Sequence, residues 1–235
     1  YNAPGFKQSS MMASMLELGI KFLLSYLIGS LMGSMIMGYL RGGVDIREMG
    51  SRNAGGTNAL RTQGWVFALG VVVIDIGKGI VGTGVVPGLA LPFVEENPEL
   101  SRTWLTIFCA CASVIGHVWP IWHEFRGGKG AATLIGTLIV LAPAILTPVI
   151  GVWLLMLALS GFVGLSTMCA GLAAAVVVGI MRLPGDQPLF IYCASMSLYL
   201  IFCHRSNIRR MLEGTENRVT KACLLYTSDA ADERS

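Results

Sequence analysis

The stretch GWVFALGVVVIDIGKGIVGTGVVPGLA, residues 64–90, carries only two charged side chains, Asp75 and Lys78. A helix needs about 20 mainly apolar residues to cross the hydrocarbon core of a bilayer, so this stretch is long enough. The whole chain has the same character. Of its 235 residues, 54% are hydrophobic and 13% are charged, whereas about a quarter are charged in a typical soluble domain. The sequence therefore predicts an integral membrane protein.

Other apolar runs extend this prediction to an all-α fold, a polytopic bundle of seven transmembrane helices. The expected spans are residues 16–40, 64–90, 101–123, 131–145, 146–162, 166–182 and 187–203. The fourth and fifth are short, and only Pro143 and Pro148 separate them. Proline lacks a backbone donor and clashes with the preceding turn. Hydropathy alone would also allow these two runs to form one span.

The basic residues favour seven spans with an extracytoplasmic N-terminus and a cytoplasmic C-terminus. This topology places most of the cations on the cytoplasmic side, in agreement with the positive-inside rule. They are Arg41, Arg47, Arg52, Arg61, Arg126, Lys129, Arg205, Arg209, Arg210, Arg218 and Lys221. The outer side then has Lys7, Arg102 and Arg182. Merging the fourth and fifth spans would move the C-terminal cations outside.

The two ends are interpreted separately from the bundle. Residues 1–15 are a doubtful leader, because the first methionines stand at positions 11, 12 and 15. Residues 223–235 include CLLYTSDAADE and resemble a translated sequencing adaptor, so they are not expected to belong to the fold. A single transmembrane domain is expected over residues 16–222.

The first of three polar clusters is GSRNAGGTNALR, residues 50–61. Its glycines allow sharp turns that present backbone N–H groups, and its Ser, Asn and Thr side chains add short donors. These are the ingredients of a phosphate-binding loop. Arg61 would add a forked cation. The alternative for the Gly, Ser and Asn residues alone is an ordinary loop with a helix cap.

The second cluster is GHVWPIWHEFRGGKGAAT, residues 116–133. His117 falls near the inner end of the third span. Lys129 stands between glycines before the expected fourth helix, a position suited to meeting an anion. A Walker A loop is excluded, because Ser or Thr would have to follow the lysine. The alternative for Lys129 is a charge that serves only topology.

The third cluster, HRSNIRRMLEGTE, residues 204–216, follows the last span. On a helix His204 and Asn207 share a face, which Arg210 could extend. The alternative is a basic juxtamembrane segment attracted to anionic lipid, and this is the favoured role for Arg205 and Arg209.

Two features inside the expected spans are also informative. Asp75 and Lys78 are three residues apart, and ionisable groups at such depth are costly, so they form either a structural ion pair or part of a site. The first span has small residues at four-residue spacing, which favours close helix packing. They are Gly29 and Gly33, with Ser30, Ser34 and Gly38.

Together with Asp75-x-x-Lys78-Gly79, the three clusters resemble the bacterial acyl-phosphate:glycerol-3-phosphate acyltransferase family, from about Ser30 to Glu216. The resemblance implies transfer of a fatty acyl group from acyl phosphate to the 1-hydroxyl of sn-glycerol 3-phosphate. The products would be lysophosphatidic acid and phosphate. It further implies a multi-pass protein of the bacterial inner membrane with its site on the cytoplasmic side and no metal or cofactor. Membrane lipid and a soluble phosphate acyltransferase that makes acyl phosphate would be partners, and nucleic acid would not.

The resemblance also implies roles for individual residues. The implied catalytic residues are Ser51, His204 and Asn207, with His204 as a possible general base. The implied substrate-binding residues are Asn53, Gly55, Gly56, Thr57, Asn58, Arg61, His117, Gly127, Gly128, Lys129 and Thr167. Within that set Asn58 shapes its loop, while Arg61 and Lys129 bind glycerol 3-phosphate. Glu216 is expected to form a salt bridge with a nearby arginine.

This sequence departs from the family pattern at two places. Arg52 stands where the family often has glycine, so a left-handed backbone is not expected there. Before the sixth span, Val-Ser-Leu-x-Ser is replaced by residues 163–167, VGLST, in which the first serine is absent. Thr167 can still offer a hydroxyl.

The sequence lacks the motifs of several other enzyme classes. No aspartate stands five residues after a histidine, and there is no Gly-x-Ser-x-Gly elbow, so soluble-type acyltransferases and serine hydrolases are disfavoured. The cysteines form no Cys-x-x-Cys pair. A transporter or channel for a small anion is the alternative, suggested by Asp75, Lys78 and the glycine-rich helices. Its site would be near the membrane midplane.

Overall fold

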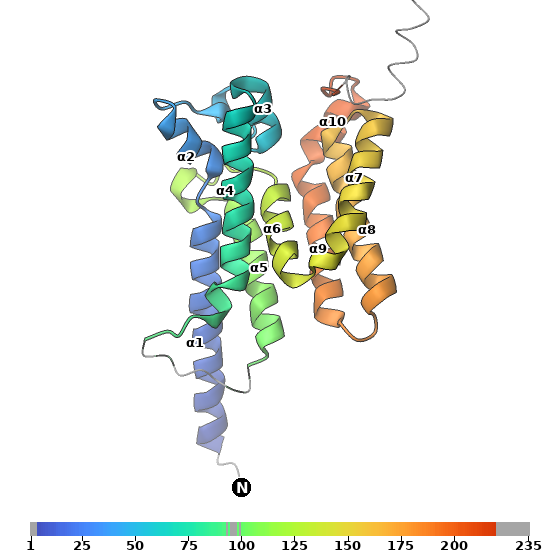
Figure 1. Cartoon of the computed structure of the whole chain (residues 1–235). Coiled ribbons are helices and arrows are strands. Elements are labelled where there is room, and N and C mark those ends of the chain that lie inside the picture. Colours follow the sequence, from blue (N-terminus) through green and yellow to red (C-terminus); the bar gives the residue numbers. More distant parts are fainter. Residues whose placement is uncertain (1–3, 93, 95–97, 99, 220–235) are drawn as a thin grey trace, which may run out of the picture. The chain divides into compact units, whose positions relative to one another are not determined.

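The computed structural model describes residues 4–92, 94, 98 and 100–219, and all regular structure within them is helical (Figure 1). The all-α prediction is therefore confirmed. The interpretation of residues 223–235 lies outside the described residues. Helix α1 begins at Pro4 and runs without a break through the doubtful leader. The chain divides into two compact units, the first ending at Leu141 and the second beginning at Ala142.

The first unit is built around α4. Its elements are α1 (Pro4–Gly29), α2 (Gly33–Leu40), η1 (Ile46–Glu48), α3 (Gly56–Gln63), α4 (Trp65–Gly84), η2 (Val86–Gly88), α5 (Arg102–Val118), η3 (Ile121–His123) and α6 (Ala131–Leu141). Helix α4 packs against α1, α2, α3, α5 and α6, and α1 packs along α5.

The second unit has η4 (Pro143–Ile145), α7 (Leu146–Ser160), α8 (Val163–Arg182), α9 (Gln187–Cys203) and α10 (Arg205–Leu212). Helix α8 packs against both α7 and α9, and α10 contacts α8 and α9. The observed α9 has the same bounds as the last expected span.

Five helical stretches in the described residues are long and apolar enough to cross a membrane. They are Met11–Gly29, Trp65–Gly88, Arg102–His123, Pro143–Ser160 and Val163–Arg182. The bent pair α9 and α10 counts as a sixth if it forms one span. Helix α6 is apolar but has only 11 residues. The fourth and fifth runs form two helices, because α6 ends at Leu141, four residues before its expected bound, and α7 begins at Leu146.

The expected continuous span over residues 16–40 was wrong. Helix α1 ends at Gly29, and α2 starts at Gly33. Buried polar groups of α4 satisfy the backbone at the break. Lys78 Nζ donates to the Leu31 carbonyl over 2.6 Å, and the Gly33 N–H donates to Asp75 Oδ1 over 3.2 Å. A broken helix is tolerated in a membrane where neighbouring groups satisfy its backbone in this way.

The small residues of α1 and α2 pack closely, as predicted. A Cβ at Gly29 would overlap the backbone of Ser113, and one at Gly33 would come within 2.6 Å of the Val71 carbonyl oxygen. A Cβ at Gly38 would overlap the Val44 carbonyl. These contacts bring α1 against α5 and α2 against α4.

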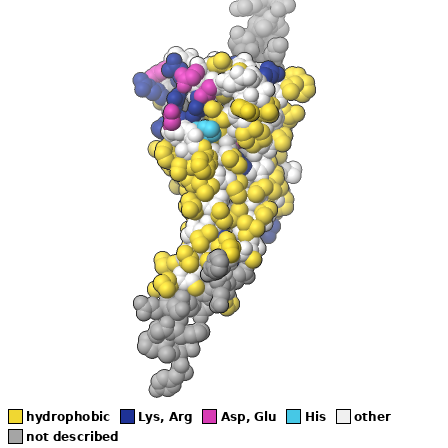
Figure 2. All heavy atoms as spheres, turned by 90° about the vertical axis from the view of Figure 1, so that its left-hand side faces the viewer, with side chains coloured by type: hydrophobic (Ala, Val, Ile, Leu, Met, Phe, Trp, Pro, Cys, Tyr) yellow, Lys and Arg dark blue, Asp and Glu magenta, His cyan; other side chains and the backbone are white. Residues whose placement is uncertain are grey.

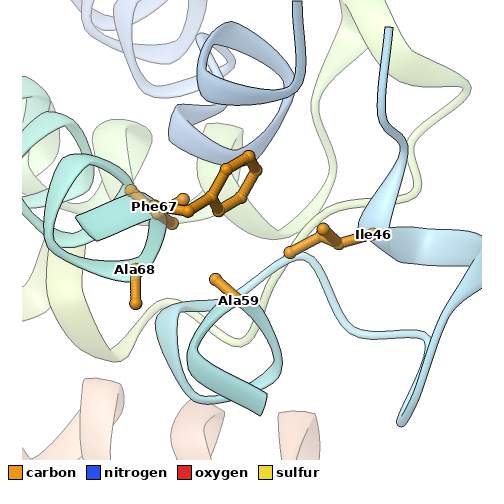
Figure 3. Packing of buried hydrophobic residues seen from close by; sticks show 5 residues of the cluster. Ile46, Ala59, Phe67 and Ala68 are labelled. Carbon is orange, nitrogen blue, oxygen red and sulfur yellow. The ribbon is translucent and has the colours of Figure 1, made fainter. Parts of the chain in front are cut away.

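A small hydrophobic cluster holds η1 and α3 against α4. Figure 3 shows the side chains of Ile46, Ala59, Phe67 and Ala68 gathered between these elements, and all four are buried. Burying a Phe or Ile side chain contributes about 1.5–3 kcal/mol. This packing fixes both ends of the loop at residues 49–55.

Candidate functional site

The loop at residues 49–55 is organised by one buried amide, Asn58 of α3. Its Nδ2 donates to the carbonyls of Ile46, Met49 and Asn53 at 2.9, 3.0 and 2.9 Å. Its Oδ1 accepts the Ser51 N–H at 2.9 Å. Asn58 therefore shapes the loop, as the resemblance implied, and its amide is directed at the loop's own backbone.

Other side chains of this cluster are exposed. Ser51, Thr57 and Arg61 are at the surface, and the structure shows no side-chain hydrogen bond for these three within the part of the chain that it describes. Asn53, Gly55 and Gly56 are half-buried around them. Two hydroxyls and a guanidinium are thus available on a loop whose backbone Asn58 holds in place.

Arg52 corrects one expectation. Its φ is 57°, which lies in the left-handed region that the sequence argument had ruled out. Gly50, two residues earlier, has a positive φ of 55°, and a Cβ there would overlap Asn58 Oδ1. The Arg52 N–H donates to the Met49 carbonyl over 2.9 Å. The hydrogen bonds of the loop therefore hold a non-glycine residue in a conformation that costs about 1–2 kcal/mol.

Substituting Arg52→Gly is expected to raise the free energy of unfolding by about 1 kcal/mol, because glycine adopts positive φ without the steric cost. Thermal unfolding in detergent measures this effect. Arg52→Ala is the matched control, since it removes the same charge but keeps the Cβ and hence the strain. Equal stabilisation by both substitutions would show that the charge, and not the backbone, is responsible.

The second cluster folds back on the end of α5. The Gly127 N–H donates to the Val118 carbonyl over 3.2 Å, and the Gly128 N–H donates to the His117 carbonyl over 3.1 Å. A Cβ at Gly127 would overlap the His117 carbonyl oxygen. Gly127 and Gly128 thus shape the loop, and their own N–H groups are directed at the protein. Gly130 has φ 87°, which a residue with a side chain rarely adopts.

Lys129 is half-buried in this loop, two residues before the first residue of α6. The Gly130 carbonyl accepts the Leu134 N–H over 2.8 Å and so belongs to the first turn of that helix. A cation beside N–H groups at a helix N-terminus is a suitable arrangement for an anion.

His117 differs from the implied substrate contact. It is 2% exposed, and its ring lies between Asp75 and Gly128. His117 Nδ1 is 3.4 Å from Asp75 Oδ1, and a Cβ on Gly128 would overlap His117 Nε2. We therefore interpret His117 as a buried residue that packs against Gly128 and supports the loop at residues 127–130.

The sequence placed Arg47 only among the cytoplasmic cations. In the structure its side chain holds the turn at residues 123–126, which precedes the glycine loop. Its NH1 donates to the carbonyls of His123 and Arg126 at 3.1 and 3.3 Å. Asp45 holds the guanidinium through a 2.7 Å ion pair, and this hydrogen bonding keeps the pKa of Asp45 below its usual value and raises the pKa of Arg47. Both groups therefore stay charged at neutral pH. Asp45 also caps η1, and this Asp-x-Arg spacing was the available signal.

The clamped turn is strained. Glu124 and Phe125 both have φ 57°. Consecutive non-glycine residues in this region are costly and persist only where surrounding contacts hold them. Arg126 also pairs with Glu48 at 2.9 Å. Charged side chains gather at one end of the face in Figure 2, above a mainly hydrophobic surface.

In the second unit, His204 lies at the junction of α9 and α10 and is 4% exposed. His204 Nδ1 is 2.8 Å from the Leu200 carbonyl oxygen. Because a carbonyl only accepts hydrogen bonds, Nδ1 must carry the proton. The lone pair of the neutral ring is then on Nε2.

Asn207 and Glu216 form a second polar group in this unit. Asn207 Nδ2 donates to Glu216 Oε1 over 2.8 Å, and Arg210 Nε donates to Glu216 Oε2 over 2.6 Å. The expected salt bridge of Glu216 is confirmed. A Cβ on Gly164 would lie 3.0 Å from Asn207 Nδ2, so residues of α8 approach this group closely.

Thr167 has a different environment. Its Oγ1 donates to the Val163 carbonyl over 2.8 Å and accepts from Trp153 Nε1 over 3.2 Å. The hydroxyl thus links α7 to α8 and has a packing role in the structure.

The described residues contain no group of three or more His, Cys, Asp or Glu side chains that could hold a metal ion.

Taken together, these features define a helical membrane protein with polar, glycine-rich loops at helix ends. A family model described as glycerol-3-phosphate acyltransferase matches residues 19–214. The chain belongs to the glycerol-3-phosphate acyltransferase family and is an acyltransferase.

Similar proteins agree with this membership. Glycerol-3-phosphate acyltransferase of Chlorobium limicola is 37% identical over 220 residues, covering 83% of this chain and 94% of that protein. The protein of the same name from Chlorobaculum tepidum is 37% identical over 218 residues, with the same coverage. Crystal structures of PlsY, an integral membrane glycerol 3-phosphate acyltransferase, match with TM-scores of 0.72 and 0.71 for the glycerol 3-phosphate and lysophosphatidic acid forms. Each is 27% identical and covers 86% of this chain and 94% of PlsY.

Proposed function

We propose that this protein transfers a fatty acyl group from acyl phosphate to the 1-hydroxyl of sn-glycerol 3-phosphate, giving lysophosphatidic acid and phosphate. The observation that carries this proposal is the match to relatives named glycerol-3-phosphate acyltransferase, which extends along 94% of their length. The glycine-rich loops and the basic residues that accompany them suit substrates that bear phosphate. An acyl phosphate is an activated mixed anhydride, so positioning and electrostatic stabilisation can supply much of the rate.

The first unit supplies groups that suit two phosphates. We assign Ser51, Asn53 and Thr57 to the phosphate of the donor, on the loop that Asn58 shapes. Their hydroxyl and amide groups, together with the backbone N–H groups of Gly55 and Gly56, would be neutral donors for this anion. We assign Arg61 and Lys129 to glycerol 3-phosphate, because a permanent charge strengthens hydrogen bonds to phosphate.

We assign His204 as the general base of the reaction. The 1-hydroxyl oxygen attacks the acyl carbonyl carbon, the bond between that carbon and the phosphate oxygen breaks, and phosphate leaves with the electron pair. His204 Nε2, which bears the lone pair, accepts the hydroxyl proton. A phosphate oxygen of the donor is the competing acceptor. Asn207, held by Glu216, orients the hydroxyl.

The remaining assignments concern location. We propose seven spans, including the short α6, with the N-terminus extracytoplasmic and the polar clusters on the cytoplasmic side of the bacterial inner membrane. The distribution of basic residues supports this orientation. The donor would then come from a soluble phosphate acyltransferase.

A comparison of donors tests the proposal. Purified protein in detergent is incubated with glycerol 3-phosphate and either palmitoyl phosphate or palmitoyl-CoA, and lysophosphatidic acid is measured by mass spectrometry. Product from palmitoyl phosphate alone is expected. Product from palmitoyl-CoA alone would overturn the donor assignment. A protein that only transported anions would yield no product from either.

A further inference from the structure

A buried polar network links the broken helix of the first unit to its glycine loop. Asp75 Oδ1 is 3.0 Å from Lys78 Nζ and 3.4 Å from His117 Nδ1. The Asp75 and Lys78 side chains are 2% and 3% exposed. The sequence left open whether these residues form a structural ion pair or part of a site. In the structure they form an ion pair, and this pair also contacts other groups.

On one side this pair hydrogen-bonds the backbone at the break between α1 and α2. As described above, Lys78 Nζ donates to the Leu31 carbonyl, and Asp75 Oδ1 accepts the Gly33 N–H. Gly33 also approaches so closely that a Cβ would be 3.2 Å from Asp75 Oδ1. The carboxylate is thereby fixed by two elements at once.

On the other side the carboxylate faces His117, and His117 faces the loop. Gly128 lies against the imidazole so closely that any Cβ would overlap Nε2, and its N–H is bound to the His117 carbonyl. Rotation of the ring would therefore displace Gly128. Lys129 is the next residue.

We propose that Asp75 and Lys78 are positioning residues, which hold Lys129 at its binding position by fixing the His117 ring beneath Gly128. This inference rests on the proposed function, in which Lys129 binds glycerol 3-phosphate. Because displacement of a binding group by about 1 Å can cost about 10²-fold in rate, a rigid support for the loop is significant.

The same unit has a second buried ion pair that offers a matched control. Glu17 and Lys21 are 2.8 Å apart and each 1% exposed, and Lys21 Nζ donates to the Pro87 carbonyl over 2.8 Å. Arg102 also pairs with Glu17 at 2.5 Å. These contacts connect α1, η2 and α5, and none of them involves residues 127–130.

The experiment compares two double variants, Asp75→Asn with Lys78→Met, and Glu17→Gln with Lys21→Met. Removing both charges of each pair avoids leaving one buried charge without its partner. The first variant is expected to raise the KM for glycerol 3-phosphate about 10-fold, with kcat changed less than about threefold. The second is expected to leave this KM within about twofold of wild type, because the contacts of its pair are with η2 and α5.

A third variant, His117→Gln, leaves the ion pair intact and changes only the side chain that transmits its effect. This variant is also expected to raise the KM for glycerol 3-phosphate about 10-fold. If the first double variant cannot be recovered in folded form, the KM of His117→Gln tests the inference by itself. A wild-type KM in folded His117→Gln, or equal KM values in the two double variants, would overturn the inference. Absence of turnover in the wild-type protein would instead refute the proposed function.

Discussion

Replacing Lys129 with methionine is expected to lower kcat/KM for glycerol 3-phosphate by about 10³-fold. Lys129 is half-buried in a loop whose glycines hold it at the start of α6. Loss of a preorganised cation from an anion site costs about 10²–10³-fold where one donor is removed, and substrate binding is weakened as well. Initial rates of phosphate release, with glycerol 3-phosphate varied, measure the effect.

Arg126 provides the matched control for this experiment. It lies three residues earlier, but its side chain is 52% exposed and pairs with Glu48. Arg126→Met removes the same formal charge, and a change of less than about threefold is expected, since surface ion pairs contribute little. Equal losses in the two variants would mean that general positive charge, and not the position of Lys129, is required.

Replacing His204 with asparagine is expected to lower kcat by about 10²–10⁴-fold, the usual contribution of a general base. Asparagine can place an N–H near the position of Nδ1 and so keep a donor for the Leu200 carbonyl, but it has no group at the position of Nε2. Thermal stability should therefore change little while turnover falls. Single-turnover rates measure the chemical step.

The competing mechanism gives a different result. If a phosphate oxygen of the donor takes the hydroxyl proton, His204→Asn would retain most of its kcat. His204→Ala, which loses the N–H as well, would then be less stable than His204→Asn but equally active in its folded fraction.

Much of this fold could be predicted because membrane helices have a strong compositional signal. Mainly apolar runs located the helices, and the prolines after residue 141 separated α6 from α7. The break in the first span was missed, because its cause lies in another helix. The Leu31 carbonyl and the Gly33 N–H are hydrogen-bonded by Lys78 and Asp75, and no feature of residues 16–40 predicts these contacts.

For some of the predicted site residues, the structure shows which groups of the protein their side chains contact. Asn58 and Glu216 have the structural roles that were expected of them. His117 and Thr167 were assigned to substrate, yet their side chains face the protein. Arg52 shows the limit of reasoning from residue type, because tertiary hydrogen bonds impose a left-handed backbone that its side chain disfavours. Arg47 was seen only as one more cation, since its carbonyl partners are distant in sequence.

The most direct measurement is the product balance of the purified protein supplied with palmitoyl phosphate and glycerol 3-phosphate. Lysophosphatidic acid and inorganic phosphate are expected in equal amounts. Neither should form when glycerol 3-phosphate is omitted, and both should form far more slowly when Lys129→Met replaces the wild-type protein. Phosphate release at the same rate without glycerol 3-phosphate, with free fatty acid as the other product, would contradict acyl transfer to this acceptor.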